Sequence, residues 1–171
     1  LGHLAAIWGL GGSVRRLRLT AVGAEIQMER PMSYPGELAA ALAGPAANLA
    51  LAVLGALVFT AMSLLLPVAQ LAQSDVFYYF YTMFLPMFSL INLYLMFFNL
   101  LPIPPLDGSS IFAFFLPKKY LPQYYKVQRY AMPVFLIVVL LVPYVLHFNP
   151  IGIYLDVTAG NVFDLLFSFA G

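Results

Sequence analysis

Long apolar stretches without a charged residue dominate the chain. Three of them contain no Asp, Glu, Lys or Arg: residues 38–74, 76–106 and 130–155. Each is longer than the roughly 20 apolar residues that cross a hydrocarbon core about 30 Å thick. The pattern predicts membrane-spanning helices at about 38–66, 76–101 and 132–146, and a final apolar segment at 151–169.

The composition narrows the class of protein further. Of the 171 residues, 63% are hydrophobic and 9% are charged. In a soluble domain, about a quarter of the residues are charged. This excludes a water-soluble globule, a disordered tail and a free-standing nucleic-acid binder, and the net charge of +1 implies no attraction to DNA or RNA. The absence of cysteine excludes disulfides, thiolate zinc sites and cysteine nucleophiles.

A polar interval, residues 11–37, precedes the first long apolar stretch. Leu17 and Leu19 alternate with polar residues before Val22-Gly23, and Ile26 and Met28 alternate after it. Alternation on both sides of a glycine is typical of a β-hairpin, which we expect over residues 14–29.

The basic residues predict the orientation in the membrane. All eight Lys and Arg lie within residues 15–30 and residues 118–129, and two predicted spans separate these places. Both therefore lie on the same face, which the positive-inside rule assigns to the cytoplasm. We expect a multi-pass protein of the cell membrane.

Two ionisable side chains are candidates for chemistry at membrane depth. Asp107 follows a proline-rich turn, in which a regular helix cannot form. Irregular backbone is tolerated in a bilayer only where protein or a water-filled cavity shelters it. Asp107 precedes the basic Lys118 by 11 residues, and His3 precedes Arg15 by 12 residues. Their side chains are therefore expected at similar depth, where an imidazole and a carboxylate can share a metal. Taken singly, His3 also fits an interfacial or hydrogen-bonded histidine, and Asp107 a turn residue or helix cap.

Three motifs together resemble the site-2 protease family of intramembrane zinc metalloproteases. The opening LGH is similar to the end of that family's H-E-x-x-H, and AGPAANLALA (43–52) is similar to its A-G-P-x-x-N segment. The third, NLLPIPPLDG (99–108), is similar to its N-x-x-P-x-P-x-L-D-G segment. The resemblance implies an all-α polytopic fold with a short membrane-associated hairpin.

The resemblance also implies roles for particular residues. His3 and Asp107 are expected to bind one Zn²⁺, and Asn48 and Asn99 are candidates to orient substrate or stabilise the oxyanion. The implied reaction is hydrolysis of a peptide bond in or near the transmembrane segment of a membrane-embedded protein substrate. The first His and the general-base Glu of H-E-x-x-H fall immediately before Leu1, so we expect the chain to be truncated inside its zinc-binding helix.

Two alternatives stay open at this stage. The chain can be a catalytically dead remnant of that family, or a small transporter with an ion site at Asp107. We divide the chain into a catalytic membrane core at 1–115 and a basic loop with C-terminal helices at 116–171. Asp156, Asn161 and Asp164 form one polar stripe in the last segment, which is expected in the interface or at a cavity mouth.

Overall fold

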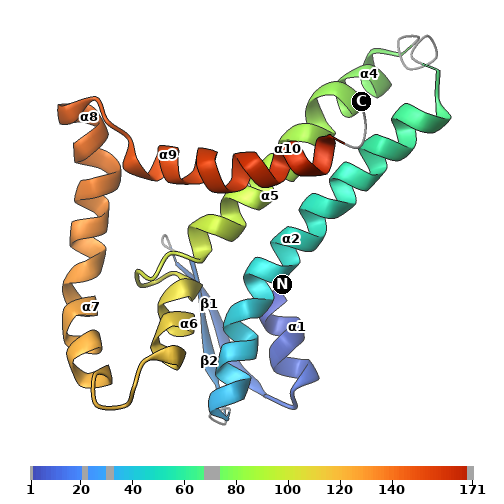
Figure 1. Cartoon of the computed structure of the whole chain (residues 1–171). Coiled ribbons are helices and arrows are strands. Elements are labelled where there is room, and N and C mark those ends of the chain that lie inside the picture. The colour runs from blue at the N-terminus through green and yellow to red at the C-terminus, as the bar shows by residue number, and fades with distance from the viewer. Residues whose placement is uncertain (1, 21–22, 30–32, 68–73, 169–171) are drawn as a thin grey trace. The chain divides into compact units, whose positions relative to one another are not determined.

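The computed structural model describes residues 2–20, 23–29, 33–67 and 74–168. The chain forms two compact units, and each is described by itself. The first unit comprises Leu1–Ala46 and Asn99–Phe148, and the second comprises Ala47–Phe98 and Asn149–Gly171. Helices make up most of both, and one hairpin supplies the strands of the described residues (Figure 1).

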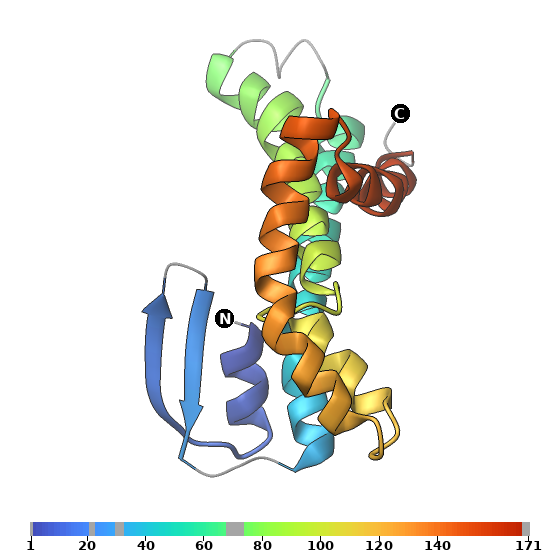
Figure 2. The same ribbon diagram turned by 90° about the vertical axis from the view of Figure 1, so that its left-hand side faces the viewer.

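The hairpin belongs to the first unit and follows the short helix α1 (Gly2–Gly9). Strands β1 (Val14–Thr20) and β2 (Gly23–Met28) pair antiparallel (Figure 2). In their register Leu17 lies opposite Ile26 and Arg18 opposite Glu25. A register irregularity lies between Val14 and Arg16. The predicted hairpin is confirmed, while the predicted turn at Val22 falls partly outside the described residues.

Three helical runs in the described residues are long and apolar enough to span a membrane. They are Pro35–Leu65 within α2 (Tyr34–Leu65), Asp75–Asn99 and Leu121–Leu146. The second run consists of α4 (Asp75–Tyr79), η1 (Phe80–Phe84) and α5 (Leu85–Asn99). The third consists of α7 (Leu121–Leu136), η2 (Ile137–Leu141) and α8 (Val142–Leu146). The predicted polytopic helical membrane fold is confirmed.

One boundary differs clearly from the prediction. The third run begins at Leu121 and not near Met132. Its first turns carry Lys126 and Arg129, so they form a helix without the continuous apolar character on which the prediction depended. The segment after Phe148 is also helical, as α9 (Pro150–Leu155), η3 (Asp156–Gly160) and α10 (Asn161–Phe167), and it is not one of the three candidate spans.

Small side chains allow the helices of the second unit to pack closely. Ala52 of α2, Leu93 of α5 and Ala159 of η3 are fully buried and form one cluster. Without a strong hydrophobic force in lipid, such close backbone approach favours helix association through van der Waals contact. The hydroxyl of Tyr154 also donates a hydrogen bond to the carbonyl of Phe97, at 3.3 Å. The C-terminal helices are thus attached to α5.

In the first unit, α7 packs against α6 (Asp107–Phe115). The hydroxyl of Tyr124 donates to the carbonyl oxygen of Ser109 at 2.9 Å, and the ring of Tyr124 lies 5.4 Å from that of Phe112. This contact lies two residues from Asp107, so α7 supports the helix turn from which that carboxylate projects.

Candidate metal centre

His3 lies in the first turn of α1, and a backbone carbonyl fixes its ring. The Nδ1 atom of His3 lies 2.6 Å from the carbonyl oxygen of Ala40 in α2. A carbonyl oxygen can only accept, so Nδ1 carries the hydrogen and donates it. In the neutral ring Nε2 then has a free lone pair, which is the arrangement of most histidines that bind a metal.

Asp107 is the first residue of α6 and follows the proline-rich loop. Within this loop the amide N–H of Leu106 donates to the carbonyl of Ile103 at 2.9 Å. A side chain at Gly108 would collide with the backbone carbonyls of Leu100 and Leu101, so the loop closes directly over this glycine. Backbone packing therefore sets the position from which the Asp107 carboxylate projects.

The two side chains meet although 104 positions separate them in the sequence. The Nε2 atom of His3 lies 3.3 Å from Oδ2 of Asp107, and both side chains are partly exposed. Nitrogen and oxygen ligands lie about 2.0–2.2 Å from zinc, so two of them on a tetrahedral ion are about 3.3–3.5 Å apart. The observed separation fits two neighbouring ligands of one zinc ion. In the metal-free protein, the two groups can share a proton at the same separation.

Gly44 of α2 lies against both side chains of this pair. A methyl group at this position would contact Nε2 of His3, and would lie 2.6 Å from Cε1 of His3 and 2.9 Å from Oδ2 of Asp107. These separations are shorter than van der Waals contact. The absence of a side chain at Gly44 thus lets the imidazole nitrogen and the carboxylate oxygen lie directly against the backbone of α2.

The donor set fits zinc in kind. Imidazole nitrogen and carboxylate oxygen are ordinary zinc ligands, and a catalytic site takes three protein ligands and leaves one position open. Among the described residues, no group of three or more His, Cys, Asp or Glu is close enough to hold a metal. His3 and Asp107 therefore fit as two members of a ligand set.

The two asparagine candidates differ in their place in the fold. Asn99 is the last residue of α5 and belongs to the same unit as His3 and Asp107. Asn48 lies on the part of α2 that belongs to the second unit. Their roles toward a substrate stay predictions.

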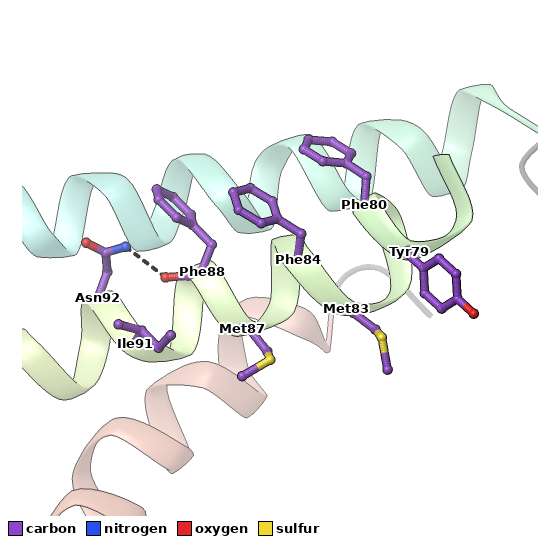
Figure 3. A pocket seen from close by; sticks show the side chains of 8 residues that line it. All are labelled: Tyr79, Phe80, Met83, Phe84, Met87, Phe88, Ile91 and Asn92. Carbon is purple, nitrogen blue, oxygen red and sulfur yellow. Dashed lines mark hydrogen bonds between the residues drawn. The ribbon is translucent and has the colours of Figure 1, made fainter. Parts of the chain in front are cut away.

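A separate cavity of about 570 Å³ lies in the second unit along α4, η1 and α5. Figure 3 shows its lining, in which Phe80, Phe84 and Phe88 follow one another at helical spacing. The Asn92 amide donates to the carbonyl of Phe88 at 2.8 Å. No His, Asp or Glu lines the cavity, so we assign it no part in hydrolysis.

Sequence reasoning missed three residues that position the candidate pair His3 and Asp107. Ala40 acts through its backbone carbonyl, which no side-chain motif reveals. Tyr124 acts through the carbonyl of Ser109 and was one of many aromatic residues. Gly44 carried a usable signal, because a Gly-Pro pair inside a long apolar helix marks a place where another group approaches closely.

Comparison with known proteins gives one match. The family model described as Peptidase family M50 matches residues 61–142, which include Asp107 and the proline-rich loop before it. This confirms the resemblance to site-2 proteases. No curated protein and no solved structure matches the chain.

Proposed function

Because residues 61–142 belong to Peptidase family M50, we propose that the chain forms part of an intramembrane zinc metalloprotease. Its reaction is hydrolysis of a peptide bond in or near the transmembrane segment of a membrane protein. The observation that carries the proposal is the 3.3 Å approach of His3 Nε2 to Asp107 Oδ2, against the bare backbone of Gly44.

Three of the described residues have roles in zinc binding in this proposal. His3, its ring held by the carbonyl of Ala40, and Asp107, at the start of α6, would hold the zinc. Zinc supplies the chemistry of lowering the pKa of a bound water and polarising the scissile carbonyl.

Substrate handling falls to the asparagines and the hairpin. We assign Asn48 and Asn99 to hydrogen bonds with the substrate backbone or the oxyanion. The two-stranded sheet has an outer edge on each strand, and an unwound substrate can pair with such an edge. Unwinding is needed because a helical peptide bond is sterically shielded. In this proposal the basic loops and the opening of the site face the cytoplasm.

Metal stoichiometry tests the proposal directly. Purified full-length protein is expected to hold about one zinc per chain, measured by inductively coupled plasma mass spectrometry. Asp107→Asn and His3→Ala are each expected to lose most of this zinc and the cleavage of a membrane-embedded reporter substrate. The matched control is Asp156→Asn, which removes a carboxylate from the second unit and is expected to keep both.

The outcomes separate the proposal from its alternatives. Full zinc and full cleavage in both site variants would refute it. Zinc that depends on both residues, without cleavage of any membrane substrate, would indicate the catalytically dead remnant.

A further inference from the structure

The basic segment, Lys118–Arg129, carries four cations without an acidic partner. Lys118, Lys119, Lys126 and Arg129 are all exposed, and none forms an ion pair within the described residues. The sequence supplies no nearby counter-charge either, since residues 108–155 contain no Asp or Glu. These cations therefore require an external anion or bulk water.

Along this segment, α7 has an inner face and an outer face of different composition. The inner face carries Leu121, Tyr124, Gln128 and the buried Phe135, and on it Tyr124 contacts α6. Lys126 and Arg129, three positions apart, share the outer face with Tyr125 and Tyr130, which are 56% and 68% exposed. The outer face is thus both cationic and aromatic.

Helix length places this outer face at the edge of the bilayer. The run Leu121–Leu146 has 26 residues, or about 39 Å at 1.5 Å per residue, against a hydrocarbon core of about 30 Å. The charge-free part from Tyr130 to Leu146 has about 17 residues, which is enough to cross most of that core. Lys126 and Arg129 therefore lie in the headgroup layer, where tyrosines also gather.

We propose that the basic segment binds the headgroups of acidic phospholipids in the leaflet that surrounds the start of α7. Clusters of four or more Lys and Arg next to a transmembrane helix attract such lipids, and their attraction decays within a Debye length. Lys119 also lies over the ring of Tyr120, 4.7 Å from its centroid, which orders one cation of the segment. This binding surface is independent of the proteolytic function.

The test measures lipid selectivity on the full-length protein. The protein is reconstituted in phosphatidylcholine vesicles containing spin-labelled phosphatidylglycerol or spin-labelled phosphatidylcholine. Electron paramagnetic resonance then gives the association of each lipid with the protein surface. We expect a several-fold preference for phosphatidylglycerol, most of which is lost in the double variant Lys126→Gln/Arg129→Gln. The conservative pair Lys126→Arg/Arg129→Lys is expected to keep the preference.

A control variant that removes two cations from another part of the protein tests whether the lipid preference depends on the basic segment itself. Arg15→Gln/Arg16→Gln takes two exposed cations from β1 and is expected to leave most of the preference. The proposal is overturned if Lys126→Gln/Arg129→Gln retains wild-type selectivity with unchanged helix content. It is also overturned if the β1 variant loses as much, because net charge alone would then explain the preference.

Discussion

Among the described residues, two pairs of distant polar side chains meet, and they differ in what surrounds them. His3 and Asp107 join α1 to α6 in the first unit, 3.3 Å apart beside the bare backbone of Gly44. Tyr94 and Asp156 join α5 to η3 in the second unit, where the phenol donates to Oδ1 of Asp156 at 2.7 Å. Both pairs have a carboxylate as one member, yet only one has the features of a metal centre.

The difference lies in the group that faces the carboxylate. The phenol of Tyr94 carries its own hydrogen and satisfies the carboxylate by donating it, so the pair needs nothing more. The imidazole of His3 already donates from Nδ1 to the carbonyl of Ala40. In the neutral ring Nε2 is therefore an acceptor, and it faces Oδ2 of Asp107, which is also an acceptor. Two acceptors that face one another need a proton or a cation between them. A polar contact inside a membrane protein thus indicates a site when its members lack a donor.

The largest effect on this comparison is expected from Gly44→Ala. The added methyl group would contact the His3 ring and Asp107 Oδ2, so zinc affinity is expected to fall by about 10- to 100-fold, as when a support of a metal ligand is lost. Helix content should not fall, because alanine favours helix more than glycine. Competition with a chromophoric chelator measures the affinity.

Gly160→Ala is the control for that variant. A methyl group at Gly160 meets nothing within 4 Å, so zinc affinity is expected to stay at the wild-type value. Unchanged affinity in Gly44→Ala would contradict the inference that the metal ligands need the bare backbone of Gly44.

A smaller effect is expected from Tyr94→Phe. Loss of the hydrogen bond to Asp156 should lower the free energy of unfolding by about 0.5–1.5 kcal/mol, the usual size of such bonds between membrane helices. Zinc content should remain at the wild-type level. Denaturant titration in detergent measures the stability, with Tyr144→Phe as control, because Tyr144 is 81% exposed. A loss of zinc in Tyr94→Phe would remove the distinction between the two pairs.

The smallest effect is expected from Ser89→Ala. The Ser89 hydroxyl is fully buried, faces Gly55 and has no hydrogen-bond partner among the described residues. Its removal should change the free energy of unfolding by less than about 1 kcal/mol, in the stabilising direction if desolvation dominates. Ser63→Ala is the comparison, since Ser63 donates to the Thr60 carbonyl at 2.9 Å. Marked destabilisation in Ser89→Ala alone would mean that the hydroxyl has a partner within the folded protein.

The sequence predicted the features that depend on local pattern and on counting. Charge-free stretches predicted the spanning helices, and alternation predicted the hairpin over 14–29. Similar distances from basic residues predicted that His3 and Asp107 lie at similar depth, and the structure places them in contact. Their function as zinc ligands stays a prediction.

The features that escaped prediction depend on tertiary contacts. The carbonyl of Ala40 and the hydroxyl of Tyr94 find their partners only after distant helices pack. The start of α7 at Leu121 escaped because its first turns are helical without being apolar. Hydropathy reports what faces lipid, and it does not report where a helix begins in the headgroup layer.

The closure of the proline-rich loop over Gly108 has a consequence for how this site can vary. Since main-chain atoms occupy the place of any side chain there, no neighbouring substitution can make room for one. Random mutagenesis with selection for a working protein should therefore accept diverse apolar residues at Ile103 and Leu106 and return only glycine at residue 108.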